Sequence, residues 1–331
     1  MAETIVTTSQ ISNRTQAYAV AKLLSRALPL LVFEKFGQTF PMPSNSTTVA
    51  KFRRFEALDA TPNQLTEGVT PTAKQLTVTD VTSTLKQYGD LVIISDIVND
   101  VNEDPVLDMA VEVLGEQAAI MLEKMRYGVL AAGTNVFYAN GSARNAVNTV
   151  LTLNLLRKIV RALKAQNCRP ITSIVKSSPS YGTAAVAPGY VAIMHSDCEA
   201  DLRGIAGFTD VKNYGNTAPF EGEIGAVEGI RFILSTVIAP FADAGGAKGS
   251  MVSTSGTSAD VYPILVLAKD AYGIVPLKGK SAITPTVLNP GVASKSDPLG
   301  QRGYVGWKAM QTAVILNQAW MARAEVAVTA L

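Results

Sequence analysis

The sequence of 331 residues is poor in charge and in the residues that usually carry out catalysis. Asp, Glu, Lys and Arg make up only 17% of it, against roughly a quarter in an ordinary domain, while 47% is hydrophobic. It has one histidine, His195, and two cysteines, Cys168 and Cys198. Two thiols cannot form a disulfide framework, so we expect a reducing compartment.

These scarcities also limit the possible sites. His195 and Cys198 are three residues apart, but structural zinc needs four ligands and Cys168 is the one further soft ligand. Gly279-Lys280-Ser281 resembles the end of a phosphate-binding loop, yet Pro285 prevents the helix that such a loop must open. Glu221 and Glu223 are expected to be solvated. We therefore predict no catalytic residue, no metal site and no cofactor.

Long hydrophobic runs are also missing. A membrane-spanning helix needs about 20 mostly apolar residues, and runs such as Ala27–Phe33 and Ile264–Ala268 are far shorter. A soluble protein that buries much of its surface against neighbouring subunits remains. The net charge of +2 argues against a strongly basic nucleic-acid binder, but it permits a container with DNA inside.

The part of the chain from Ser44 to Ser95 is predicted to form a long two-stranded ribbon. Thr47–Phe55 has the composition of an outgoing strand, and a return strand rich in Thr and Val starts at Gln75. Ala57–Ala73 between them contains Pro, Gly and Asn and is expected to be a loop at the tip. Because an isolated ribbon is barely stable and its edges invite pairing, a ribbon of this length suggests a partner subunit.

A long helix is predicted next, over Pro105–Ala132, with Asp104 as its cap and Gly133 at its end. Its 28 positions correspond to about 42 Å. From Asn148 the pattern is mixed: Thr152 caps an amphipathic helix, Ser196 opens a helix through Phe208, and several short strands follow. The predicted fold class is α+β.

A basic cluster in the outgoing strand is the first candidate for an interaction site. Lys51, Arg53 and Arg54 could meet an acidic patch on a neighbouring subunit, or they could form a solvated strand face. We weigh these interpretations equally. Together with Glu67 and Gly68 of the tip, they are the predicted inter-subunit contacts.

The order of these elements resembles that of the tailed-bacteriophage major capsid proteins with the Hong Kong 97-type fold. Local sequences are similar to the N4-like major capsid proteins in five stretches: Leu85–Asp100, Leu114–Gly133, Phe220–Ser235, Tyr262–Leu277 and Asp297–Val328. The resemblance implies a non-enzymatic subunit that assembles as hexamers and pentamers into an icosahedral shell around double-stranded DNA. It also implies a location in the virion, with assembly in the host cytoplasm.

The resemblance further implies five parts: an N-terminal arm (1–43), an extended hairpin (44–95), a peripheral domain with a spine helix (96–147), an axial domain (148–299) and C-terminal strands returning to the peripheral domain (300–331). Because the arm is short, a separate scaffolding protein is expected, with a portal as a further partner. Two alternatives stay open. One is an encapsulin-like nanocompartment shell with a bound enzyme, and the other is an unrelated α/β enzyme that uses His195.

Overall fold

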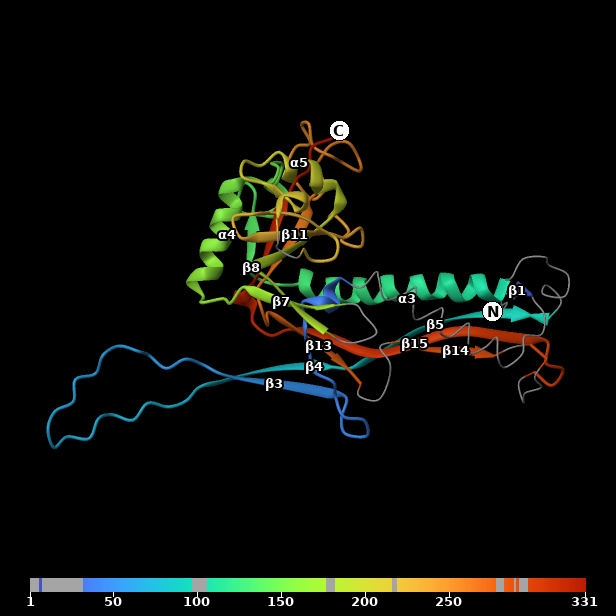
Figure 1. Cartoon of the computed structure of the whole chain (residues 1–331), viewed down its shortest axis with the longest axis horizontal. Coiled ribbons are helices and arrows are strands. Elements are labelled where there is room, and N and C mark those ends of the chain that lie inside the picture. Colours follow the sequence, from blue (N-terminus) through green and yellow to red (C-terminus); the bar gives the residue numbers. More distant parts are fainter. Residues whose placement is uncertain are drawn as a thin grey trace.

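The fold is built from two larger sheets, one long helix and a projecting ribbon (Figure 1). The computed structural model describes residues 6–7, 32–96, 106–176, 182–215, 219–277, 283–288, 290–291 and 297–331. Strands and helices are both present in the same unit, as the predicted α+β class requires.

The first sheet lies under the long helix. Its strand order is β1 (Val6–Thr7), β5 (Lys86–Ser95), β15 (Arg302–Ile315), β13 (Tyr272–Pro276) and β2 (Gln38–Thr39), and β14 (Thr284–Leu288) also pairs with β15. β15 and β5 run antiparallel over ten residue pairs, from Arg302 opposite Ser95 to Gln311 opposite Lys86. This long pairing supports the helix along most of its length.

The second sheet stands above one end of the first (Figure 1). Its order is β6 (Val136–Tyr138), β16 (Met321–Val326), β12 (Tyr262–Leu267), β8 (Gly182–Met194), β11 (Ile230–Leu234), β10 (Glu223–Val227) and β9 (Thr209–Asp210), and β7 (Ile171–Lys176) pairs with β8. Two helices accompany it, α4 (Leu153–Ala165) and α5 (Glu199–Arg203). The two C-terminal strands thus part: β15 joins the first sheet and β16 the second.

The long helix is α3 (Val106–Ala131), within one residue of the prediction at each end. The predicted cap Asp104 and Pro105 lie outside the described residues. Leu107, Val111, Leu114, Ala118 and Leu122 are buried at helical spacing and pack against Val305, Trp307 and Ala309 of β15. Met121 and Met125 are partly buried beside this cluster.

α4 also follows its prediction. The side chain of Thr152 accepts a hydrogen bond from the Leu155 amide, and Leu156, Ile159 and Leu163 are buried on one face. The helix predicted from Ser196 through Phe208 is wrong in extent, since α5 ends at Arg203. Its cap also differs: His195, not Ser196, caps the preceding 3-10 turn, because its Nδ1 accepts a hydrogen bond from the Asp197 amide.

A buried ion cluster joins the end of α3 to the second sheet. Nη1 of Arg323 in β16 donates to the carbonyl oxygens of Ala131 and Gly133, which the end of α3 leaves without helical partners. Glu325, fully buried, accepts from Arg323 at 2.9 Å and from two nitrogens of Arg144 at 2.8 Å. One carboxylate therefore orients two guanidinium groups at the junction.

We expect Glu325→Gln to destabilise the subunit by about 3–5 kcal/mol, because it leaves the buried guanidinium of Arg323 without a counter-charge. The matched control is Glu228→Gln, which removes a carboxylate from an exposed pair with Arg157 and should cost about 0–1 kcal/mol. Urea unfolding of unassembled subunits measures both. Equal midpoints for the two variants would show that the junction does not depend on Glu325.

Candidate functional site

The most unusual surface is the ribbon of β3 (Val49–Phe55) and β4 (Val78–Thr84), which extends beyond the body of the molecule (Figure 1). The strands pair antiparallel, from Val49 opposite Thr84 to Phe55 opposite Val78. Among the described strands β3 pairs with β4 alone, so its other edge carries backbone groups with no strand beside them. The two strands and the irregular tip lie within the predicted range Ser44–Ser95, but Lys86–Ser95 form β5 of the first sheet and not part of the ribbon.

The base of the ribbon is fastened to the first sheet. Leu85 lies between β4 and β5 and is buried with Met42 and Val275, while Phe52 packs at the margin of this cluster. The ring of Phe40 meets that of Phe52 edge-on, with centroids 5.0 Å apart. Because β4 leads through one residue into β5, the ribbon continues the sheet that supports α3.

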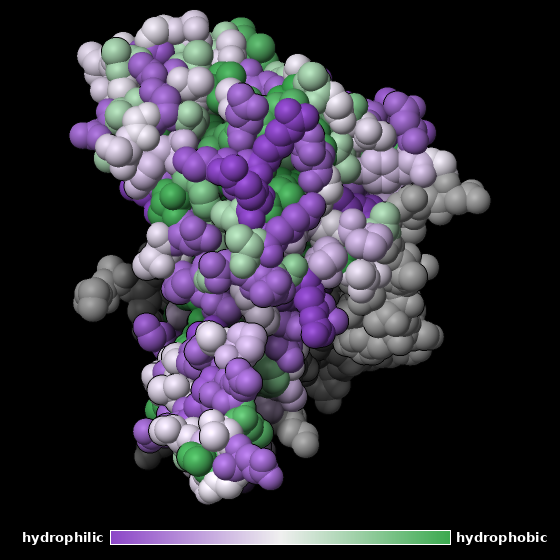
Figure 2. Space-filling model, turned by 90° about the vertical axis from the view of Figure 1, so that its left-hand side faces the viewer, coloured by the Kyte–Doolittle hydropathy of each residue, from purple (hydrophilic) through white to green (hydrophobic). Residues whose placement is uncertain are grey.

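The outer part of the ribbon leaves apolar side chains in solvent. The exposed fractions are 62% for Phe55, 68% for Leu65, 62% for Val69 and 59% for Leu76. Figure 2 views the molecule from this side, and hydrophobic patches are visible on the ribbon below the body. Single exposed apolar residues are ordinary, but several along one projection that has no core of its own indicate a surface that another chain covers.

All three residues of the predicted basic cluster form ion pairs within the ribbon. Asp80 of β4 accepts from Lys51 at 2.7 Å and from Arg53 at 2.9 Å. The hydrogen bond from Arg53, and then that from Lys51, hold the pKa of the Asp80 carboxyl below its usual range. Arg54 pairs with Glu56 at 2.8 Å. The partners that sequence reasoning missed are thus Asp80, which faces Arg53 across the ladder, and Glu56, two residues beyond Arg54.

The five predicted contact residues do not form one cluster. Lys51, Arg53 and Arg54 lie in β3, whereas Glu67 and Gly68 form an exposed turn in the tip loop. Gly68 has a φ of +79°, which favours glycine at this position. Both groups belong to the ribbon, so the structure places them along one projection.

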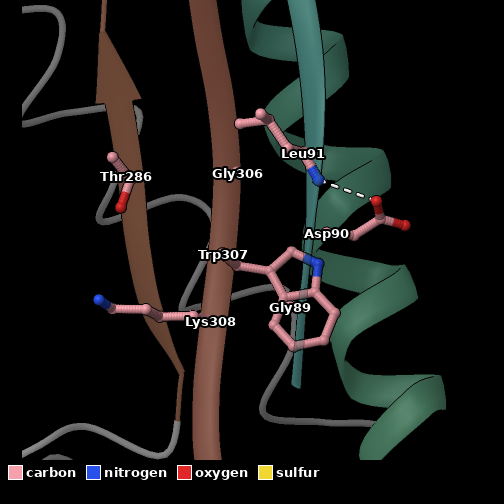
Figure 3. Close-up of a pocket in the computed structure, with 7 residues that line it drawn as sticks. All are labelled: Gly89, Asp90, Leu91, Thr286, Gly306, Trp307 and Lys308. Atoms are coloured by element: carbon pink, nitrogen blue, oxygen red, sulfur yellow. Dashed lines mark hydrogen bonds between the residues drawn. The ribbon is translucent and has the colours of Figure 1, made fainter. Parts of the chain in front are cut away.

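A second open surface lies on the first sheet, on the face away from α3 (Figure 3). A shallow hollow of about 440 Å³ is lined by β5, β14 and β15 and floored by Gly89 and Gly306. A Cβ on Gly89 would come within 2.6 Å of the Trp307 carbonyl oxygen, so the close approach of β5 and β15 requires glycine. Leu91 at the rim is 51% exposed.

The two cysteines considered as metal ligands lie inside the fold. Cys168 and Cys198 are buried free thiols, and burial raises the pKa of Cys168 to about 11. Within the described ranges no three His, Cys, Asp or Glu side chains gather as metal ligands, and no helix there is long and apolar enough to cross a membrane. The Gly279-Lys280-Ser281 stretch lies outside the described residues.

The expectation that Glu221 and Glu223 are both solvated is wrong for Glu223. Glu221 is exposed and pairs with Lys35 at 2.7 Å. Glu223 is buried and accepts from Nε and Nη2 of Arg231 at 2.8 and 2.7 Å. The antiparallel pairing of β10 with β11 brings the two side chains together.

Comparison with known proteins gives a consistent result. A family model described as "Phage capsid protein" matches residues 78–323. No curated protein sequence matches the chain. The capsid of cyanophage Pam1 is similar in structure, with a TM-score of 0.66 and 12% identity over 100% of this chain and 97% of that chain.

Two further capsid structures agree. That of Ralstonia phage GP4 has a TM-score of 0.64 and 12% identity over 89% of this chain and 88% of that chain. That of cyanophage P-SCSP1u has a TM-score of 0.58 and 14% identity over 90% of this chain and 89% of that chain. At such identities the likeness shows a shared fold, whereas the family match covers most of the sequence. The chain belongs to the phage capsid protein family, as a structural subunit of the head shell.

Proposed function

We propose that the subunit tiles as hexamers and pentamers into an icosahedral shell, with the ribbon as a strap over the adjacent copy. One observation carries this proposal: the ribbon projects from the body with an unpaired strand edge and exposed apolar side chains. Sixfold and fivefold rings use one heterologous contact at different angles, so a strap attached at its base suits both. Apolar contacts contribute most of the association energy, at about 25 cal/mol per Å² before ordering costs.

The charges of the ribbon support a contact between subunits. The side chains of Lys51 and Arg53 remain 53% and 56% exposed although both pair with Asp80. They can therefore also meet a carboxylate of a neighbour, and with Arg54, Glu67 and Gly68 they are the proposed contacts. Since exposed pairs contribute only about 0–1 kcal/mol, their role is to set the register of the strap.

In this proposal the parts of the Hong Kong 97-type fold keep the boundaries expected from the sequence. Residues 1–43 are the arm, 44–95 the hairpin, 96–147 the peripheral domain with α3 as spine, and 148–299 the axial domain. The packing of β15 against α3 supports a return of 300–331 to the peripheral domain, while β16 continues into the second sheet.

The proposed partners follow from the same assignment. They are sister copies, a separate scaffolding protein, a portal and the packaged double-stranded DNA, and the subunits assemble in the host cytoplasm. The resemblance to the N4-like branch is part of the proposal. Electron microscopy of the purified protein tests it, since closed shells, tubes or isolated rings are expected, and particles that stay monomeric at high concentration contradict it.

Deletion of Pro62–Thr72 should leave a folded subunit that assembles poorly. These residues form the exposed tip and make no contribution to the buried clusters of the described chain. Circular dichroism should therefore match that of the intact protein, while sedimentation and electron microscopy should show few shells. Normal shells from the deletion variant would rule out the strap.

The double substitution Leu65→Ser and Val69→Ser should raise the critical concentration for assembly at least tenfold. Fully burying one such side chain contributes about 1.5–3 kcal/mol, and both are largely exposed in the single subunit. Thr66→Ser with Thr70→Ser is the matched control in the same loop, and it should assemble like the unmodified protein. Light scattering against concentration measures both. Identical thresholds would show that the tip is not covered on assembly.

A further inference from the structure

The distribution of charge along the chain is strongly uneven, although the net charge is only +2. Residues 124–196 contain no Asp or Glu and nine Lys or Arg. All 27 acidic residues therefore lie elsewhere, and the rest of the chain is net negative. The net charge of the whole chain conceals this basic segment. Because a locally basic surface attracts anions, the segment indicates an anionic partner.

The exposed cations of this segment concentrate on α4. Arg157, Lys158, Arg161 and Lys164 are all exposed, and the helix carries no acidic residue. Arg157, Arg161 and Lys164 are spaced by four and three residues, so they form one stripe opposite the buried face. Figure 2 looks onto this side of the molecule, where hydrophilic side chains gather over the upper body that bears α4.

The stripe is little neutralised by the chain itself. Arg157 pairs with Glu228 at 2.8 Å, and the Lys158 ammonium lies 5.8 Å from the ring centroid of Phe137. Arg161 and Lys164 have no ion pair within the part of the chain that the structure describes. Like charges one turn apart on a helix repel one another, so the stripe does not stabilise α4. A bound anion would relieve this repulsion.

We propose that the exposed face of α4 is a binding surface for the phosphate backbone of double-stranded DNA. Duplex DNA carries one negative charge per about 1.7 Å of its axis, and the stripe from Arg157 to Lys164 spans about 10 Å, enough to follow neighbouring phosphates. The stripe consists of Arg and Lys alone, and contacts from such side chains to phosphates position a protein without reading sequence. The inference rests on the proposed function, in which the shell encloses DNA, and it places α4 on the interior side.

The test uses the full chain as unassembled subunits and a short labelled duplex of mixed sequence. Fluorescence anisotropy gives the affinity between low and moderate salt. Each phosphate contact adds about 0.9 to the slope of log affinity against log salt concentration. Arg161→Gln with Lys164→Gln should therefore lower that slope by about 1.8, with circular dichroism unchanged.

The matched control is Lys212→Gln with Lys248→Gln, which removes two cations outside α4, one from the 3-10 helix Val211–Asn213 and one from a loop. It should keep the slope of the unmodified protein. An unchanged slope in the α4 variant, an equal loss in the control, or no DNA binding by the unmodified protein would each overturn the inference.

Shell formation by the same variants separates this inference from the proposed function. If the α4 variant forms shells and keeps its slope, the DNA surface is wrong and the capsid assembly stands. If the α4 variant keeps the salt dependence of DNA binding but no longer forms shells, α4 instead contacts an acidic surface of a sister copy. This result also overturns the inference. If the unmodified protein never assembles, the proposed function fails whatever the DNA measurement shows.

Discussion

The contact of Arg323 with the end of α3 is the constraint on which the arrangement of the molecule depends. A helix ends with carbonyl groups that lack hydrogen-bond donors within the helix. Here the Arg323 guanidinium of the second sheet donates hydrogen bonds to the carbonyl groups at the end of α3. The buried carboxylate of Glu325 pairs with this guanidinium, which is also buried, and with that of the half-buried Arg144. A charge taken out of water is costly unless it is fully paired, so the contact allows few other geometries. The contact ties β16 of the second sheet to the end of α3.

The ribbon continues this organisation outward. β4 passes through the buried Leu85 into β5, and β5 pairs with β15 under α3. A rigid sheet therefore supports a projection whose outer part has no core. In the proposed assembly, that combination lets one subunit keep its own fold while the ribbon adapts to a neighbour. The basic face of α4 lies on the upper body, above the ribbon and on the same side of the molecule.

Much of the architecture could be predicted because it depends on local patterns. The length of α3 follows from its apolar spacing and the glycine after it, and α4 follows from the cap at Thr152. The failures have tertiary causes. Glu223 looked like a surface carboxylate until β11 brought Arg231 against it, and the helix after His195 is shorter than its capping pattern indicated. The stripe on α4 was not singled out, since the nearly neutral net charge obscured it.

The sequence by itself determined the class of protein: few charges, one histidine, no spanning run and an order of elements typical of a capsid subunit. Those properties depend on composition and on the order of residues along the chain, and both are given by the sequence itself. Only the tertiary structure decided which charges meet. Asp80 pairs with Lys51 and Arg53, and Glu325 pairs with Arg144, whereas Arg161 and Lys164 are exposed. The sequence does not show these outcomes, because pairing and burial depend on residues that are distant in sequence.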